Sequence, residues 1–364
     1  MRHIFFGAFD CDIHRQQEPY IPLISVIILN YNAGDWLARS VASVAAQTLA
    51  DFECFVVDNN STDGSIDALP PLDDRFTVIR LDENTGFAKG NNIGAAKASG
   101  QWIALLNPDA FARPDWLEHL IAETDHPDVT MVGSTQYMAL EPGIYDGAGD
   151  CYHVTGLAWR AKFGHKVGND GDSADKGIAC EVFGPCAAAA LYHRKTFTRL
   201  GGFDERFFCY HEDVDLAYRM RLDGGICIQS AAAKVDHISS GISGRASDFA
   251  VYHGTRNRIW TWYKNTPALA MLITGPAFLA LNAALLLWSS FRPGRFKPTF
   301  RGMRHGFKGL SAIKDSRRAV QSKRKISTVS LLLMMAWNPV NVVTRNLHSR
   351  HILQSPLPSA EESD

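Results

Sequence analysis

The chain has 364 residues, of which 46% are hydrophobic and 21% are charged. This composition is typical of a globular protein and excludes disordered, collagen-like and low-complexity chains. The formal net charge of -1 argues against a general nucleic-acid-binding protein, so we expect no nucleic-acid partner.

The small net charge conceals an asymmetry along the chain. Residues 1–290 contain 23 Lys and Arg against 34 Asp and Glu. Residues 291–350 contain 14 Lys and Arg and one acidic residue, Asp315, and residues 351–364 add three acidic side chains. An acidic body with a basic C-terminal segment predicts an anionic surface as a partner.

The cysteines and the N-terminus indicate the compartment. The seven cysteines are scattered without a C-x-x-C pair, so we expect neither a disulfide framework nor a zinc cluster. A reducing cytosol is the default for such a chain. Residues 1–22 carry a short apolar patch followed by charges, which predicts an N-terminal tail rather than a secretory signal peptide.

Residues 23–125 alternate between short apolar runs and segments with helical spacing. The apolar runs predict strands at 24–29, 52–58, 76–81 and 102–107. Helices are predicted at 35–47, at 86–98 and from Pro114 onward, and the turn residues 59–65 predict the start of another short helix. This alternation predicts an α/β fold with a doubly wound, mostly parallel sheet.

The pattern changes after residue 126. Residues 139–176 are rich in Gly, Asp and Ala and predict loops with short strands. Residues 180–194 predict a buried strand pair or a strand followed by a turn, and a short strand leads through Ile226 and Ile228 to His237. Residues 248–264 predict a helix.

Polar residues follow the predicted parallel strands, where sheets of this kind bind ligands. These residues are Asn30, Tyr31, Asp58, Asn84, Asn107 and Asp109. Asp58 is placed to accept hydrogen bonds from a base or a ribose, although a helix cap is an equal alternative. Asn107 and Asp109 present an amide and a carboxylate where a divalent cation could bridge two phosphates, with a helix cap as the alternative for Asp109.

Two glycines, Gly86 and Gly90, fall within a predicted helix, where glycine costs stability. Close approach of the backbone to a ligand would explain them, and a loop that needs glycine is the alternative. The first strand is not followed by G-x-G-x-x-G, which disfavours a nicotinamide cofactor.

Three carboxylates, those of Glu212, Asp213 and Asp215, fall within four positions. Their repulsion raises a pKa, as is typical of a functional site, and one of them could act as a general base on a hydroxyl. The alternative is an acidic helix N-terminus that the helix dipole favours. His237 follows a strand and is structural unless the carboxylate of Asp109 is its partner.

Together these segments resemble family 2 glycosyltransferases with the GT-A fold. The match is to the bacterial rhamnosyltransferase-like branch, which builds O-antigen and related cell-envelope glycans. The resemblance covers residues 23–265, and the order and spacing of its motifs in one chain make it specific. The motifs are SVIILNYN (25–32), VVDNNSTDGS (56–65), NTGFAKGNNIG (84–94), LLNPD (105–109), GGFDERFFCYHEDVDL (201–216) and His237.

The resemblance implies roles for these residues. Residues 23–125 would bind the nucleotide sugar, and residues 126–265 would bind the acceptor and carry the catalytic groups. Asp213 would be the catalytic base, with Glu212 and Asp215 supporting it or contacting the acceptor. The donor pocket would be lined by Asn30, Tyr31, Asp58, Asn84, Gly86, Phe87 and Asn107. A divalent metal, Mn²⁺ or Mg²⁺, would be held by Asp109, Asn107 and His237, with Asn107 standing where the family usually has the first Asp of a D-x-D motif.

The resemblance also implies the reaction. A sugar would move with inversion from dTDP-rhamnose or a UDP-sugar to a hydroxyl of a glycan or lipid-linked acceptor. A galactofuranosyl- or other hexosyltransferase is the alternative within this class. A decayed nucleotide-sugar-binding protein and a nucleotidyltransferase are alternatives from other classes. The intact Asp58, Asp109, Asp213 and His237 argue against the first, and the lack of a Gly-rich basic loop after the first strand argues against the second.

Residues 266–364 form an apolar and basic C-terminal segment, predicted to be helical. Residues 265–291 carry no charge and match a membrane-spanning helix in length, but a single span would place the basic residues 292–325 outside. We therefore expect a re-entrant or interfacial segment against anionic headgroups, with buried helices or an oligomer contact as the alternatives. The predicted location is cytoplasmic, peripheral on the inner face of the plasma membrane, and the oligomeric state is not predicted.

Overall fold

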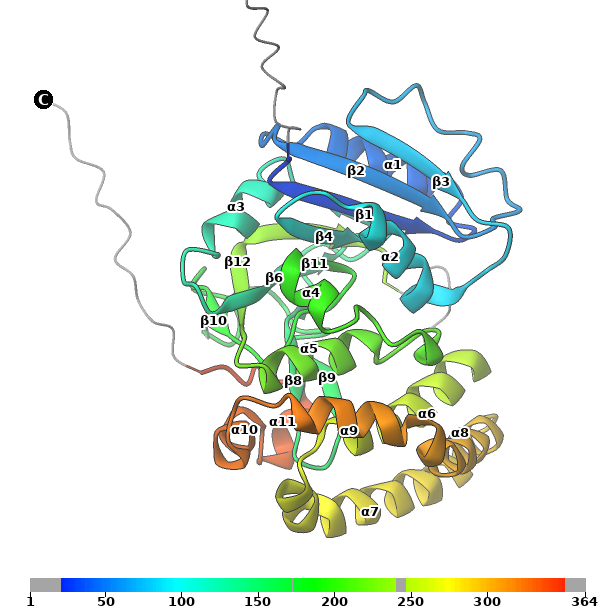
Figure 1. The fold of residues 1–364 in the computed structure, drawn as a ribbon, viewed down its shortest axis with the longest axis vertical. Coiled ribbons are helices and arrows are strands. Elements are labelled where there is room, and N and C mark those ends of the chain that lie inside the picture. Colours follow the sequence, from blue (N-terminus) through cyan, green and yellow to red (C-terminus); the bar gives the residue numbers. More distant parts are fainter. Residues whose placement is uncertain (1–20, 172, 240–246, 351–364) are drawn as a thin grey trace, which may run out of the picture.

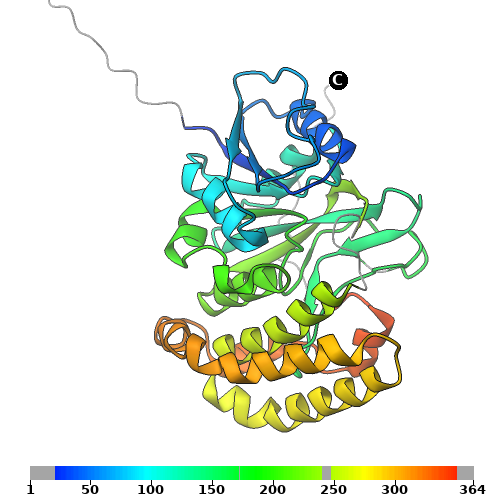
Figure 2. The ribbon, with the colours of Figure 1, turned by 90° about the vertical axis from the view of Figure 1, so that its right-hand side faces the viewer.

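The computed structural model of the protein describes residues 21–171, 173–239 and 247–350. A mixed ten-stranded sheet lies at its centre, and helices cover both faces of this sheet. The C-terminal helices gather at one end of the molecule, opposite the end that carries β1–β3 (Figures 1 and 2).

The structure contains the following strands and helices, given in chain order. The strands are β1 (Ile24–Asn30), β2 (Phe52–Asp58), β3 (Phe76–Arg80), β4 (Trp102–Leu106), β5 (Ala110–Ala112), β6 (Val129–Met138), β7 (Tyr145–Ala148), β8 (Asp150–Tyr152), β9 (Ala158–Arg160), β10 (Cys180–Glu181), β11 (Ala189–His193) and β12 (Ile226–His237). The helices are α1 (Asp35–Ala45), α2 (Gly86–Lys97), α3 (Trp116–Ala122), α4 (Arg194–Arg199), η1 (Glu205–Phe207), α5 (Glu212–Leu222), α6 (Asp248–Asn265), α7 (Ala268–Ser290), α8 (Phe296–Lys308), η2 (Gly309–Ile313), α9 (Lys314–Ser322), α10 (Thr328–Met334) and α11 (Pro339–Thr344).

The strand order of the large sheet is β10-β12-β6-β11-β4-β1-β2-β3. Outside this order, β5 pairs with β12, and β7 pairs with β6. Strands β3, β2, β1 and β4 are parallel, as the sequence predicts for the first half. Strand β11 then enters antiparallel to both β4 and β6. Both halves of the chain therefore share one sheet, and the carboxyl ends of β1, β2 and β4 meet at the same edge.

Two local predictions are wrong. Residues 59–65 form the predicted turn with N-cap chemistry, in which Asp63 accepts hydrogen bonds from the backbone and hydroxyl of Ser65, but the bond from Ala68 N to the Gly64 carbonyl closes a single turn that does not continue into a helix. Of the two alternatives for residues 180–194, the strand pair is wrong, because its two strands do not pair with each other. Strand β10 pairs with β12, and β11 lies between β4 and β6.

The sheet buries both of its faces, and its central strands β1, β4 and β11 are mostly apolar. One face packs on α1 and α3 through residues such as Val26, Val41 and Leu117. The opposite face packs on α2, α4 and α5 through residues such as Ile27 and Met220. This three-layer arrangement fixes the strand ends that carry the polar residues.

Helix α6 joins the C-terminal helices to the sheet domain through a buried ionic contact. The carboxylate of Asp215 in α5 is fully buried and accepts from Arg219 Nε at 2.9 Å and Lys264 Nζ at 2.9 Å. Asn265 Nδ2 donates to its other oxygen at 2.8 Å, and Lys264 also pairs with Asp204 at 2.7 Å. Burial raises the pKa of Asp215, but the charges of Lys264 and Arg219 outweigh burial and lower it below its usual value.

We expect Asp215→Asn to lower the free energy of unfolding by about 3 kcal/mol or more, because it leaves the buried Arg219 without its carboxylate and leaves Lys264 with Asp204 as its remaining carboxylate. Asp67→Asn is the matched control, since Asp67 pairs with Arg80 at an exposed site and should cost less than about 1 kcal/mol. Urea unfolding of both variants measures the difference. Equal costs would show that the buried network does not hold α5 and α6 together.

Candidate active site

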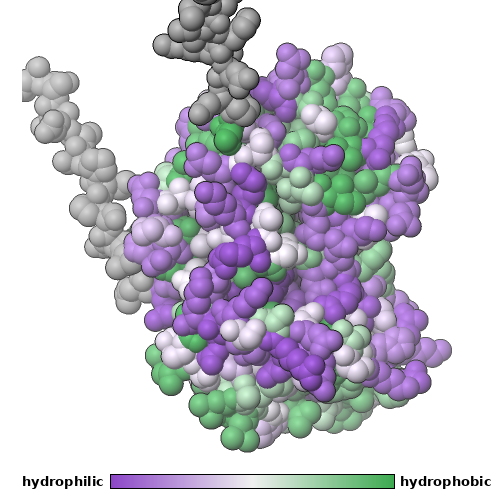
Figure 3. Space-filling model, in the orientation of Figure 1, coloured by the Kyte–Doolittle hydropathy of each residue, from purple (hydrophilic) through white to green (hydrophobic). Residues whose placement is uncertain are grey.

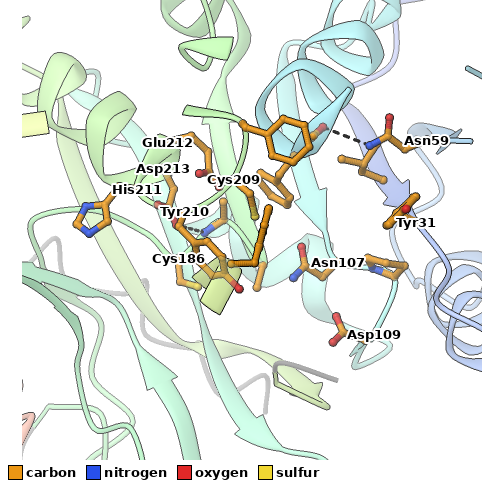
Figure 4. A pocket seen from close by; sticks show the side chains of 18 of the residues that line it. Tyr31, Asn59, Asn107, Asp109, Cys186, Cys209, Tyr210, His211, Glu212 and Asp213 are labelled. Atoms are coloured by element: carbon orange, nitrogen blue, oxygen red, sulfur yellow. Dashed lines mark hydrogen bonds between the residues drawn. The ribbon is translucent and has the colours of Figure 1, made fainter. Parts of the chain in front are cut away.

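A cavity of about 620 Å³ opens where the carboxyl ends of β1, β2 and β4 meet the segment that leads into α5. In Figure 4, Asn107 and Asp109 lie across the cavity from Glu212 and Asp213, and Tyr31 and Asn59 lie at the far end. Nine of the predicted site residues line this cavity. They are Tyr31, Asn84, Gly86, Phe87, Asn107, Asp109, Glu212, Asp213 and His237. Asn30, Asp58 and Asp215 are not part of its lining.

Asn30 and Asp58 form a buried pair beside the end of the cavity that Tyr31 and Asn59 line. The register of β1 and β2 sets Asn30 opposite Asp58, and Asn30 Nδ2 lies 3.1 Å from Asp58 Oδ1. The same amide group donates to the hydroxyls of Ser61 and Ser65 at 3.0 and 2.9 Å. Asn30 therefore holds the turn after β2 in place and orients the carboxylate of Asp58.

Gly86 allows α2 to meet the segment before α5. Its φ is +79°, and a Cβ atom here would lie 2.5 Å from a ring carbon of Phe208. Asn84 Oδ1 accepts from Gly86 N at 2.9 Å and from Asn59 Nδ2 at 3.0 Å. The close neighbour of Gly86 is thus Phe208, while Gly90 makes room for the side chain of Leu29.

Asp109 and His237 form one wall through strand pairing. Strands β5 and β12 are antiparallel with His237 opposite Ala110, which places its ring beside Asp109. His237 Nε2 lies 3.2 Å from Asp109 Oδ1, and Nδ1 lies 2.8 Å from Asp146 Oδ2. Burial lowers the pKa of His237, but the two carboxylate hydrogen bonds outweigh it and raise the pKa above its usual value.

Arg160, which also lines the cavity, balances the charge beside this wall. Its guanidinium contacts the fully buried carboxylate of Asp146. Burial raises the pKa of Asp146, but the charge of Arg160 and the hydrogen bond to His237 lower it to about 2. Asp146 therefore stays ionised and fixes the ring of His237 from the side away from Asp109.

Asp213 and Glu212 stand at the start of α5 on the opposite wall. Asp213 accepts from Val214 N at 2.8 Å and from Ala187 N at 3.4 Å. Burial raises the pKa of Asp213, while these hydrogen bonds and the charge of Arg160 oppose the rise. Burial, together with the charge of Asp213, raises the pKa of Glu212 well above its usual value. Two carboxyls with raised proton affinity therefore face the cavity, whereas Asp215 in the same turn of α5 points into the ionic network of α6.

A third carboxyl, that of Asp150, lies close to Asp213. Ligand atoms of Asp150, Asp213 and Cys186 lie within 4.8 Å of one another. Burial and the charge of Asp213 raise the pKa of Asp150 to about 8, and burial raises the pKa of the Cys186 thiol to about 12. The charge of Asp213 thus favours the protonated form of Asp150, as in a pair of carboxyls that share a proton.

The segment between η1 and α5 has a strained backbone that α6 supports. Phe208, Tyr210 and His211 adopt left-handed φ values of 65°, 70° and 67°, which cost on the order of 1 kcal/mol or more each. The fully buried side chain of Asn257 donates to the carbonyl oxygens of Phe207, Cys209 and Tyr210 at 3.0, 2.9 and 2.7 Å. These hydrogen bonds fix the segment that delivers Asp213 to the cavity.

Several residues of the site region were not predicted from the sequence. Asn59 directly follows Asp58 at the end of a predicted strand, so its position in the sequence could have identified it as a site residue. Asp146, Asp150 and Arg160 lie in a Gly-rich region without periodicity, and no motif marks them. Asn257 lies in a helix whose aromatic residues gave no sign of an amide aimed at a distant backbone.

Comparisons with known proteins agree with this geometry. Residues 25–199 match the model of the family described as Glycosyl transferase family 2. The chain is 30% identical over 227 residues to the O-antigen biosynthesis protein RfbC of Myxococcus xanthus, which covers 60% of this chain and 17% of that protein. It is 25% identical over 305 residues to the N-acetylglucosaminyl-diphospho-decaprenol L-rhamnosyltransferase of Mycobacterium tuberculosis, which covers 75% of this chain and 95% of that protein.

Among solved structures, the crystal structure of GalNAc-T7 with UDP, GalNAc and Mn²⁺ superposes with a TM-score of 0.61 at 16% sequence identity. The superposition covers 90% of this chain and 58% of that chain. At this identity the likeness concerns the fold, and it confirms the predicted GT-A type of α/β fold. The chain spans less than half of the length of the Myxococcus protein and of a 31% identical uncharacterized glycosyltransferase of Haemophilus influenzae, of which it covers 44%.

The raised pKa of Asp150 predicts a pH-dependent stability. The folded chain holds this proton up to about pH 8, whereas the ordinary pKa of an Asp is 3.8. The contribution of Asp150 to the free energy of unfolding should therefore be largest below pH 4 and should fall as the pH rises toward 8. Asp150→Asn should remove part of that fall, while Asp115→Asn, at an exposed site, should leave it unchanged. Urea unfolding between pH 4 and pH 8 tests this, and parallel curves for wild type and Asp150→Asn would contradict it.

Proposed function

We propose that this chain, which belongs to glycosyl transferase family 2 through residues 25–199, is an inverting glycosyltransferase that uses a nucleotide diphosphate sugar. The observation that carries the proposal is the single cavity that Asp109 and His237 share with Asp213. A phosphate-binding wall and a basic carboxylate face each other there, as transfer from a diphosphate to a hydroxyl requires.

The donor end of the cavity suits a nucleotide. Tyr31 and Phe87 offer aromatic surface to a base, and Asn84 and Asn59 offer amide groups. Asp58, oriented by Asn30, lies behind them and supports the base or ribose. Similarity to the mycobacterial L-rhamnosyltransferase favours rhamnose as the sugar, for which dTDP-rhamnose is our candidate donor. A UDP-sugar that carries a galactofuranosyl or other hexosyl group is the second candidate.

The wall that Asp109 and His237 form fits a divalent cation, Mn²⁺ or Mg²⁺. Asp109 supplies a carboxylate oxygen, His237 an imidazole nitrogen and Asn107 an amide oxygen, and Asp146 orients His237 as a carboxylate commonly does behind a metal-bound imidazole. Such a cation would neutralise charge on the departing nucleoside diphosphate. Asn107 in place of an aspartate makes this wall less negative.

Asp213 serves as the general base. Its raised pKa increases its affinity for a proton, and its hydrogen bonds from Val214 and Ala187 hold it toward the cavity. The acceptor oxygen attacks the anomeric carbon, the bond from that carbon to the diphosphate oxygen breaks, and the hydroxyl proton moves to Asp213. Glu212 lies beside it and would contact the acceptor.

The acceptor is a hydroxyl of a glycan or a lipid-linked glycan in the synthesis of cell-envelope polysaccharide. The similarity to proteins of O-antigen synthesis and to a decaprenol-dependent rhamnosyltransferase supports this class. Nucleotide sugars are cytosolic, so the enzyme would work on the inner face of the plasma membrane.

Asp213→Asn should reduce transfer by about 10²–10⁴-fold, since the amide cannot accept the proton, and should leave folding and donor binding intact. The measurement is release of nucleoside diphosphate in a donor screen that includes dTDP-rhamnose and UDP-sugars. A turnover close to wild type would exclude Asp213 as the base.

Asp109→Ala and His237→Ala should each weaken binding of a nucleoside diphosphate in the presence of Mn²⁺, and should have little effect in EDTA. Asp236→Ala is the matched control, because Asp236 neighbours His237 but its side chain is exposed. Calorimetric titration with UDP or dTDP measures the effect. An unchanged Mn²⁺ titration in both variants would remove this wall as the metal site.

A further inference from the structure

Helix α7 exposes a broad apolar face. Its 23 residues include no charged side chain, and by length and composition it could cross a membrane. Only one stripe of the helix is buried against the body, formed by Ala270, Thr274, Phe278, Asn282 and Ser289. The opposite side is exposed, with 77% of Leu272, 59% of Leu279 and 63% of Leu287 accessible. An apolar surface of this extent usually has a partner.

Specific contacts hold α7 along the body. Phe278 stacks on Trp262 of α6 with ring centroids 3.9 Å apart. Asn282 Oδ1 accepts from the buried guanidinium of Arg258 at 2.7 Å. A helix that crossed the bilayer alone would leave Arg258 without this partner. Helix α7 therefore lies along the body of the protein, and its exposed apolar face points away from that body.

Helix α8 presents a different kind of surface. Gly302 and Gly306 face α6 closely, so this side of α8 is buried. Its exposed side alternates aromatic and basic residues. They are Phe296, Lys297, Phe300, Arg301, Arg304, Phe307 and Lys308. Aromatic and basic side chains on the outer face of one helix are typical of helices that lie in a membrane interface.

The charge around these helices points to the chemistry of the partner. Asp315 is the one acidic residue in 291–350, and no ion pair of the described residues uses Lys297, Arg304 or Lys308. In Figure 3 hydrophobic residues gather along the lower edge, where Figure 1 places α7. Two copies of the chain would repel each other through this basic region, whereas anionic headgroups would neutralise it.

We propose that α7 and α8 form one membrane-docking surface, defined by the exposed residues of these two helices, that binds an anionic lipid bilayer without crossing it. The exposed side of α7 enters the boundary of the acyl chains, and the basic residues of α8 meet the lipid phosphates. This proposal rests on the proposed function and specifies which surface would hold the enzyme at the membrane. Its test measures binding of the full chain to vesicles rather than sugar transfer.

The test is flotation of the full-length protein with vesicles of phosphatidylcholine and phosphatidylglycerol, compared with phosphatidylcholine alone. We expect strong binding to the anionic vesicles, a decline with salt, and release by alkaline carbonate. A Lys297→Gln, Arg304→Gln, Lys308→Gln variant should bind about 100-fold more weakly. A Leu272→Ser, Leu279→Ser, Leu287→Ser variant should also lose binding, since these side chains are exposed and their loss leaves the fold intact.

A Leu140→Ser, Lys97→Gln variant is the control, because both residues are exposed on other parts of the chain and binding should not change. Equal binding to neutral and anionic vesicles, resistance to carbonate, or an equal loss in the control would overturn the proposal. A dimer that the Leu variant dissociates, without vesicle binding, would assign the surface to a second copy. Transfer to a water-soluble acceptor is measured in parallel, so that a vesicle result and an activity result can fail separately.

Discussion

The buried contact between Asp215 and Lys264 is the constraint on which the arrangement of this protein depends. It fixes the start of α5 against the end of α6, and Lys264 reaches Asp204 in the same network. Ten residues lie between Asp204 and Asp215, and three of them adopt left-handed backbone angles. A segment with this much strain keeps one shape only if its two ends and its carbonyl groups are held from outside. Helix α6 does both, through Lys264 at the ends and Asn257 in the middle.

The electrostatics of the cavity follow from the same packing. The wall with Asp109 and His237 is stabilised by ionised partners, because Asp146 lies behind His237 and pairs with Arg160, which also lines the cavity. Among the described residues, Asp213 and Glu212 form no ion pair, and burial raises the proton affinity of both carboxyls while the charge of Arg160 opposes the rise at Asp213. One part of the cavity therefore carries ionised groups and the other carries carboxyls with raised proton affinity, within one continuous space.

The sequence predicted the parallel half of the sheet because each of its strands is a short apolar run that ends in polar residues. It also predicted most of the cavity lining, since strand ends at one edge bring Tyr31, Asn107 and Asp109 together without further information. It did not predict the insertion of β11 between β4 and β6, which depends on pairing between distant segments. The sequence also did not predict that Asp213 and Asp215 point in different directions. Residues two apart on a helix lie on different sides of it. The packing of α6 against α5, through Lys264, determines which side faces the cavity.

The attachment of α9 to α6 has a practical consequence. Arg317 donates to the carbonyl of Thr266 at 2.7 Å, and Gln321 donates to that of Asn265 at 2.8 Å, so the last turn of α6 has its free carbonyls satisfied by a later helix. Cutting the chain after α6 would expose these groups and loosen the helix that supports the strained segment. A more water-soluble form of this protein is therefore better made by replacing outward-facing side chains of α7 than by shortening the polypeptide.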